Sequence, residues 1–200
     1  RRVHSRSSAG VVSSTNRGVN RDGLDRYYTE PHLADALVGL LDVLPGHLVV
    51  EPSVGRGAFL RAARARACEV VGIDIDPEAE GLALCRPADR VVGDLLSTDI
   101  EADWYLGNPP YKHAEAHIRH AIEHAEIGCA FLLRLAFLES LKRWPFWRTH
   151  PPARVWVLSK RPSFTGGKTD SCAYAWFEWR RGYRGAAALR VLPPDFGGVS

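Results

Sequence analysis

Asn108, Pro109, Pro110 and Tyr111 are the residues of this 200-residue chain whose types and spacing point most sharply to chemistry. The two prolines fix the backbone and remove two N–H donors, so the nearby carbonyls point outward with no local competitor. The amide oxygen of Asn108 and the carbonyl of Pro109 can then accept hydrogen bonds from one substrate NH₂ group. Tyr111 offers a flat face for a planar group. We expect these four residues to be catalytic; the alternative is a proline turn with incidental polar neighbours.

A pair of glycines, Gly55 and Gly57, ends the segment that begins at Glu51. Glycines directly after a strand let the backbone turn tightly and approach a ligand closely. Taken alone, the pair fits a ligand-free turn between a strand and a helix equally well.

Two acidic residues follow at positions where a nucleotide-like ligand needs them. Asp74 lies about 20 residues after the glycines, the spacing at which an acid accepts hydrogen bonds from ribose hydroxyls. Asp76, directly before Pro77, is instead expected to cap a helix. Asp94 can receive an adenine amino group with Leu95 against the ring, or it can be a simple turn residue.

The elements that must position these residues are read from the spacing of apolar side chains. The expected strands are residues 47–50, 69–75, 90–92, 104–106, 129–133, 154–158 and 172–179. The expected helices are residues 31–44, 58–67, 78–85, 113–126 and 137–144. Strands that alternate with helices imply an α/β fold with a parallel sheet wound on both faces. Ligands of such sheets bind at the carboxyl ends of the strands, where every motif above falls.

In their order, these motifs resemble the class I S-adenosylmethionine-dependent amino methyltransferases, and are similar to DNA adenine-N6 methyltransferases of the gamma motif order. The segment Tyr28 to Pro31 resembles the part of those enzymes that precedes the glycine loop. The resemblance covers residues 27–180. It implies a Rossmann-like fold with a mostly parallel seven-stranded sheet, helices on both faces and a C-terminal antiparallel hairpin.

The resemblance also implies S-adenosyl-L-methionine as the cofactor. It assigns cofactor binding to Tyr28, Thr29, Glu51, Pro52, Ser53, Gly55, Gly57, Asp74, Ile75, Asp94, Leu95 and Asn108. Within that set, Thr29 and the glycine backbone would hold the amino-acid end, Asp74 the ribose and Asp94 the adenine amine.

On the substrate side, the resemblance implies that Asn108, Pro109 and Tyr111 hold the target base. The candidate for a second aromatic against the other face of that base is Phe164. Arg161 and Lys168 are the expected substrate contacts beside it. The loop around Lys168 can close on the substrate or can be an ordinary hairpin loop.

The formal net charge of +3 hides a strong asymmetry. Residues 27–133 carry more acids than bases, whereas residues 134–184 carry 11 Lys and Arg against 3 acids. A basic segment around a base pocket predicts binding to a nucleic-acid backbone; the alternative is a solvated basic face.

The chain divides into a flexible basic tail (residues 1–26), a catalytic domain (27–184) and a C-terminal tail (185–200). No apolar run reaches the ~18 residues that a membrane helix needs, so we expect no membrane association. Four cysteines without paired spacing and no secretory signal favour the cytoplasm, with nucleoid association if the source is bacterial or phage. We expect no metal site.

The sequence therefore predicts methyl transfer to the N6 amine of adenine in DNA. The alternatives are methylation of adenine in RNA, methylation of a protein glutamine, and a noncatalytic nucleic-acid-binding module. Cytosine-N4 enzymes more often have Ser in place of Asn108, which favours adenine. A target-recognition domain is not evident, so we expect little or short sequence specificity, or a dimer or partner that supplies it.

Overall fold

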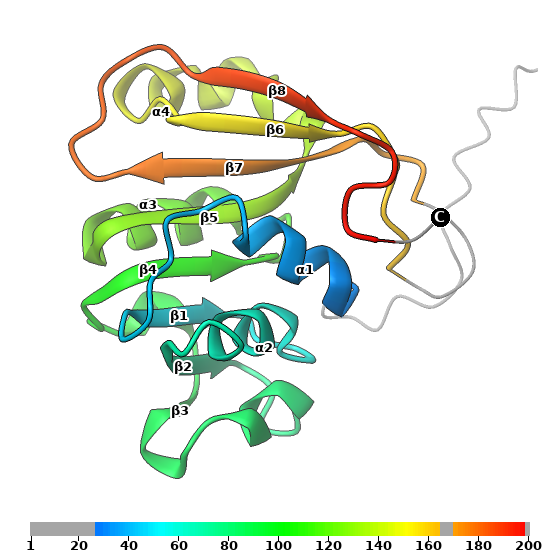
Figure 1. The fold of residues 1–200 in the computed structure, drawn as a ribbon. Coiled ribbons are helices and arrows are strands. Elements are labelled where there is room, and N and C mark those ends of the chain that lie inside the picture. The colour runs from blue at the N-terminus through cyan, green and yellow to red at the C-terminus, as the bar shows by residue number, and fades with distance from the viewer. Residues whose placement is uncertain (1–26, 165–169, 199–200) are drawn as a thin grey trace, which may run out of the picture.

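The computed structural model describes residues 27–164 and 170–198, which form an eight-stranded sheet covered on both faces (Figure 1). The order of the strands across the sheet is β3-β2-β1-β4-β5-β7-β6-β8. The strands are β1 (Leu48–Pro52), β2 (Glu69–Asp74), β3 (Arg90–Val92), β4 (Ala102–Gly107), β5 (Ala125–Arg134), β6 (Arg154–Leu158), β7 (Tyr174–Arg180) and β8 (Ala188–Leu192). Only β7 runs antiparallel to its neighbours, β5 and β6, while β8 is parallel to β6.

Helices cover the sheet from two sides. The α-helices are α1 (Pro31–Val38), α2 (Ala58–Arg64), α3 (Ala114–His124) and α4 (Trp144–Thr149). Short 3₁₀ segments connect them: η1 (Glu80–Leu84), η2 (Pro87–Asp89), η3 (Leu95–Ser97), η4 (Leu135–Leu138) and η5 (Leu141–Arg143). The alternation of side chains along the strands separates two buried cores. Trp104 packs with α1 and α2, whereas Tyr105, the next residue of β4, packs with α3 and α4.

This architecture confirms the predicted α/β class, the mostly parallel sheet and the antiparallel hairpin of β6 and β7. The predicted number of seven strands is wrong, because Ala188–Leu192 pairs with β6 as an eighth strand. The segment expected to be a C-terminal tail from residue 185 therefore contributes an edge strand. The tail expected at residues 1–26 lies outside the described residues.

The helices differ from the prediction mainly at their ends. The first helix ends at Val38 rather than near residue 44, and the expected helix at 78–85 is the 3₁₀ segment η1. The expected helix at 137–144 is replaced by η4 and η5, and α4 starts only at Trp144, with Pro145 in its first turn. Proline is tolerated there because that N–H has no partner inside the helix.

Within the described residues, no helix is long and apolar enough to cross a membrane.

Candidate active site at the carboxyl ends of the strands

The fold brings the predicted motifs together at one edge of the sheet. Since β1, β2 and β4 are parallel neighbours, the residues that follow them meet at their carboxyl ends. The backbone N–H of Gly55 donates to Asp74 Oδ2 at 2.8 Å, which ties the glycine loop to the end of β2. Asn108 follows directly after β4.

Gly55 and Gly57 both have a positive φ, but they lie against different parts of the chain. Gly57 has φ +71°, and a Cβ there would lie 2.9 Å from Gly81 Cα, so the close approach that it permits is to η1. Gly55 has φ +48°, and its Cβ would lie 3.1 Å from the Tyr28 ring. Ser53, between β1 and the glycines, also adopts a positive φ of 62°. Gly55, rather than Gly57, therefore lies beside Asp74 and beside residues 27–31, the leading segment that precedes and begins α1.

Glu51 was expected to contact the cofactor, but its carboxyl group points into the protein. Only 3% of the residue is exposed, and its Oε2 accepts a hydrogen bond of 2.8 Å from the N–H of Leu60 in α2. Burial raises the pKa of this carboxyl group from 4.5 to about 8, and the charge of Asp74 adds to the rise. The structure therefore gives Glu51 a position at the start of α2, where it holds the helix against β1.

Asp74 and Asp94 both have their carboxylates fixed by backbone donors. Asp74 Oδ1 accepts the N–H of Asp76 at 2.9 Å, while its other oxygen accepts Gly55. Asp94 is exposed and accepts the N–H of Leu96 at 3.0 Å. Ile75, next to Asp74, is 64% exposed, whereas Leu95 is buried at 2%. An exposed Ile beside an oriented carboxylate offers an apolar surface for a planar ring, whereas Leu95 packs into the core.

The side chain of Asn108 has one polar atom that is paired within the fold and one that is not. Its Nδ2 donates to the carbonyl of Tyr27 at 3.0 Å and to Thr29 Oγ1 at 3.2 Å. Its Oδ1 is buried, and no described residue donates a hydrogen bond to it. A buried acceptor without a donor is costly, at about 1–3 kcal/mol. The leading segment therefore orients Asn108 so that its oxygen is left for a donor from elsewhere.

The sequence predicted that Tyr111 and Phe164 lie on the two faces of a bound base. In the structure, no open space separates the two rings. The ring of Tyr27 lies against both, with centroids 4.9 Å from Tyr111 and 5.7 Å from Phe164. Phe164 is itself buried at 8% and contacts Tyr174 edge-on. In this structure, the place expected for a planar substrate is filled by a side chain of the leading segment.

Sequence reasoning missed Arg134 and Tyr174, which complete this cluster. The Arg134 guanidinium lies 4.3 Å from the centroid of the Tyr111 ring, and its Nε donates to the Tyr174 hydroxyl at 3.3 Å. Tyr111 donates to Tyr174 at 3.1 Å, and Tyr174 donates to Asp170 at 3.0 Å. Burial raises the pKa of Tyr174 to about 12 and that of Tyr111 further, so both phenols stay protonated and serve as donors, not bases. The available signals were the position of Arg134 at the end of an apolar strand and the alternating aromatics of β7.

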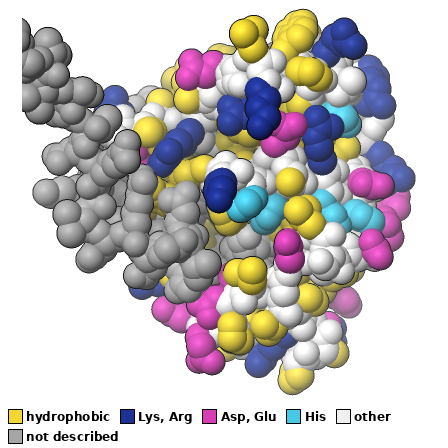
Figure 2. All heavy atoms as spheres, turned by 180° about the vertical axis from the view of Figure 1, so that it is seen from behind, with side chains coloured by type: hydrophobic (Ala, Val, Ile, Leu, Met, Phe, Trp, Pro, Cys, Tyr) yellow, Lys and Arg dark blue, Asp and Glu magenta, His cyan; other side chains and the backbone are white. Residues whose placement is uncertain are grey.

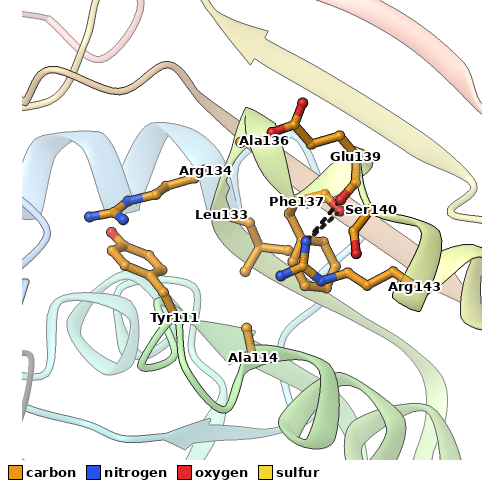
Figure 3. Close-up of a pocket in the computed structure, with 9 residues that line it drawn as sticks. All are labelled: Tyr111, Ala114, Leu133, Arg134, Ala136, Phe137, Glu139, Ser140 and Arg143. Atoms are coloured by element: carbon orange, nitrogen blue, oxygen red, sulfur yellow. Dashed lines mark hydrogen bonds between the residues drawn. The ribbon is translucent and has the colours of Figure 1, made fainter. Parts of the chain in front are cut away.

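A cavity of about 600 Å³ extends from Tyr111 and Arg134 toward η4 and η5 (Figure 3). Figure 3 shows Tyr111 and Arg134 on one side, and Phe137, Glu139, Ser140 and Arg143 on the other, with Ala114 and Leu133 between them. The lining combines an apolar floor with two guanidinium groups, Glu139 and Ser140, and so suits a planar ligand with polar edges.

The basic segment divides between the two ends of the sheet, which corrects the expectation that it surrounds the base pocket as a whole. Because β6 is parallel to β5, its last residues reach the site end, and Lys160 and Arg161 follow there as exposed side chains. Arg154 and Arg180 lie at the opposite end, where both pair with the buried Glu178. Lys168 lies outside the described residues.

Among the described residues, no group of three or more His, Cys, Asp and Glu side chains could hold a metal ion.

Comparison with known proteins relates part of the chain to nucleic-acid methyltransferases. No protein-family model matches it. Over 93 residues, it is 43% identical to the type II methyltransferase M.TthHB8I of Thermus thermophilus, a match that covers 44% of this chain and 21% of that enzyme. The chain thus spans about a fifth of the length of that relative.

Solved structures with similar folds cover most of the chain. The M protein of the type I restriction enzyme EcoKI has a TM-score of 0.65 and 17% identity, over 79% of this chain and 44% of that one. The 23S rRNA methyltransferase ErmE has a TM-score of 0.61 and 18% identity, over 80% and 71%. The magnesium protoporphyrin IX methyltransferase of Synechocystis PCC 6803, solved with bound SAM, has a TM-score of 0.51 and 18% identity, over 75% and 76%. The chain therefore has the Rossmann-like fold of class I methyltransferases.

Proposed function

We propose that this protein transfers a methyl group from S-adenosylmethionine to the N6 amine of adenine in DNA, at the site formed by Asn108 to Tyr111. The observation that carries the proposal is the buried Oδ1 of Asn108, which accepts no hydrogen bond from any described residue. Asn108 follows β4 on a methyltransferase fold, and the backbone after it is stiffened by Pro109 and Pro110.

The fold, and its occurrence in a methyltransferase solved with bound SAM, indicate S-adenosylmethionine as the cofactor. The chain offers residues that fit each part of it. Thr29 and the Gly55 backbone would hold the amino-acid end, Asp74 the ribose hydroxyls, and Asp94 with Ile75 the adenine ring. The cofactor supplies an electrophilic methyl group on a sulfonium.

The protein's own residues do the rest by positioning. Asn108 Oδ1 and the Pro109 carbonyl accept hydrogen bonds from the two N–H groups of the target amine, which favours a pyramidal nitrogen whose lone pair points at the methyl group. Tyr111 stacks on the base. Alignment of this kind supplies much of the acceleration of an in-line transfer. No general base is needed before attack, because the cationic product amine loses its proton easily, and the protonated state of Tyr111 agrees with this.

The target base has to displace Tyr27 to reach this position. The Tyr27 ring lies where the base would stack, between Tyr111 and Phe164. A base paired in a duplex cannot enter, so it is flipped out or presented on a single strand. Once Tyr27 has moved, Tyr111 and Phe164 become available to the two faces of the base.

DNA is the preferred substrate because the 43% identical relative is a type II methyltransferase and because Lys160 and Arg161 project at the site end. RNA adenine is the second candidate, supported by the shared fold of an rRNA methyltransferase. Glutamine methylation and a noncatalytic binding module remain further alternatives. A short or absent sequence preference, a dimer or specificity partner, and a place in the cytoplasm remain predictions from the sequence.

Methyl transfer from labelled S-adenosylmethionine to duplex DNA, single-stranded DNA, RNA and a glutamine-containing release-factor peptide tests the proposal. We expect label in DNA and its loss in Asn108→Ala. Label in the peptide alone would rule out a nucleic-acid substrate. Cofactor binding without label in any acceptor would support the binding module.

A further inference from the structure

The cavity of about 600 Å³ adjoins the place proposed for the target base, but neither Tyr27 nor Phe164 is among the residues that line it. The two share Tyr111 as a wall, but the proposed position of the target base is the one that the Tyr27 ring now fills, against Tyr111 and Phe164. The cavity is lined instead by residues of η4 and η5 (Figure 3). Its volume lies within the range of ligand pockets, roughly 300–1,000 Å³. A nucleotide next to the target adenine would be presented to this cavity.

The rim of the cavity continues into an exposed apolar surface. Leu138 is 42% exposed, Leu141 96% and Trp144 62%, within one short stretch of the chain. Large apolar side chains at such exposure usually mark a binding surface when they are clustered. Figure 2 shows that apolar and basic side chains intermingle on the face that carries α3 and α4.

The basic residues of this stretch are available for phosphate. Lys142 and Arg143 lie between Leu141 and Trp144, and no described carboxylate forms an ion pair with either. Arg143 donates to the carbonyl of Glu139 at 3.0 Å, and its guanidinium lies 4.6 Å from the centroid of the Phe137 ring at the cavity wall. Arg154 and Arg180, by contrast, are paired with Glu178.

We infer that residues 138–144 and the adjoining cavity bind the nucleotides next to the target adenine on an unpaired DNA strand. The cavity takes the neighbouring nucleotide, Trp144 stacks on the base beyond it, and Lys142 and Arg143 contact the phosphates. Unpaired bases expose the flat faces that an exposed indole can stack on, whereas a duplex hides them. This inference rests on the proposed function and specifies its substrate as single-stranded.

Binding and methylation of an oligothymidylate that carries one adenine, with 2-aminopurine beside it, test the inference. We expect Trp144→Ala to weaken binding by about 5-fold to 100-fold, the range for loss of one base–aromatic stack. The 2-aminopurine fluorescence change on binding should be lost too, and Trp144→Phe should restore both. Lys142→Ala should lower the slope of log K against log salt by about 0.7, the value for one phosphate on a single strand.

Two exposed residues of β8 serve as matched controls. Leu189 is 61% exposed and Arg190 is exposed, and both lie on the edge strand, apart from the cavity lining. Leu189→Ala and Arg190→Ala should bind like the wild type.

The possible results distinguish failure of this inference from failure of the proposed methyl-transfer function. The inference would be overturned if the adenine is methylated but Trp144→Ala and Lys142→Ala bind the strand as well as their controls do. The proposed function would then still stand. Tighter binding to duplex than to single strand, with Trp144→Ala affecting only the duplex, would also overturn it. Absence of methylation, with the dependence of binding on Trp144 retained, would overturn the proposed function and support the strand-binding surface.

Discussion

Glu178 and Asn108 both lie next to the central strands, at opposite ends of the sheet, and their polar groups are treated in opposite ways. Glu178 is 0% exposed, and Arg154 and Arg180 both donate to its carboxylate. Asn108 keeps a buried oxygen without a donor among the described residues. A polar group whose partners lie within the fold contributes to stability, whereas one left open at the mouth of a parallel sheet is available to a ligand.

The same comparison explains why the basic segment, residues 134–184, does not act as one nucleic-acid-binding surface. Arg154 and Arg180 each pair with both Glu178 and Asp42, so those arginines serve the fold. Lys160 and Arg161 are exposed at the other end. Charge along the sequence therefore predicts a binding surface only after the direction of each strand is known.

The largest effect on stability should come from the end of the sheet at which Glu178 is paired with two arginines. Glu178→Ala leaves two guanidinium groups without their buried partner, and loss of one partner from a buried pair costs about 3–5 kcal/mol. We expect the free energy of unfolding, measured with urea, to fall by that amount. Asp42→Ala removes a carboxylate that is 72% exposed and should change it by less than about 1 kcal/mol. Equal effects of the two substitutions would remove the distinction between buried and exposed partners.

At the carboxyl ends of the strands, Asn108→Ala should lower the rate of methyl transfer. Removal of a group that holds the reacting atoms in the transition state typically slows catalysis by about 10²-fold to 10³-fold. Single-turnover methyl transfer should fall by that factor, while urea unfolding stays close to the wild type, because the loss of the two hydrogen bonds from Nδ2 to Tyr27 and Thr29 is offset by the removal of a buried oxygen without a donor. A large loss of stability with normal transfer would place Asn108 in the same class as Glu178.

Asp74→Asn should weaken cofactor binding more than it affects the fold. Hydrogen bonds to a charged group contribute about 1.5–3 kcal/mol, so we expect the dissociation constant of S-adenosylmethionine to rise about 10-fold or more. Isothermal titration calorimetry measures this, with the exposed Asp99→Asn as the control. Unchanged affinity would remove Asp74 from the cofactor site.

Glu51 predicts a dependence of stability on pH. Its pKa is about 8 in the fold and near 4.5 when unfolded, so between these values the folded state binds the extra proton. Stability from this group is therefore lost as pH rises from about 4.5 to 8, with a slope of at most ~1.4 kcal/mol per pH unit. Urea unfolding at several pH values should show a shallower decline for Glu51→Gln, which can still accept from Leu60. An identical slope in the two proteins would show that Glu51 is ionised in the fold.

The smallest effect concerns Tyr27. Tyr27→Ala removes the ring that occupies the base position but keeps the carbonyl to which Asn108 donates. An aromatic pair contributes ~0.5–1.5 kcal/mol, so the KM for an adenine-containing strand should fall roughly 2-fold to 10-fold. Steady-state kinetics with Tyr183→Ala as the control measure this. A rise in KM would indicate that Tyr27 helps to hold the substrate.

The convergence of Gly55, Asp74 and Asn108 could be predicted because parallel strands place their carboxyl ends at one edge. The position of Tyr27 could not, since it depends on packing between residues that are far apart in the sequence. The strand Ala188–Leu192 was missed for a related reason: Leu189 and Val191 face solvent, so no buried face marks it. The direction of the Glu51 carboxyl group could not be predicted either, because nothing in its local sequence shows that this group turns toward α2.

The central claim is that Asn108 presents its free oxygen to the N6 amine of adenine. Its most direct test is mass spectrometry of nucleosides from a DNA strand incubated with S-adenosylmethionine that carries a deuterated methyl group. We expect the deuterated methyl on N6 of deoxyadenosine with the wild-type protein, and none at the same time point with Asn108→Ala. A deuterated methyl on cytosine, or on adenine at an unchanged rate in Asn108→Ala, would contradict it.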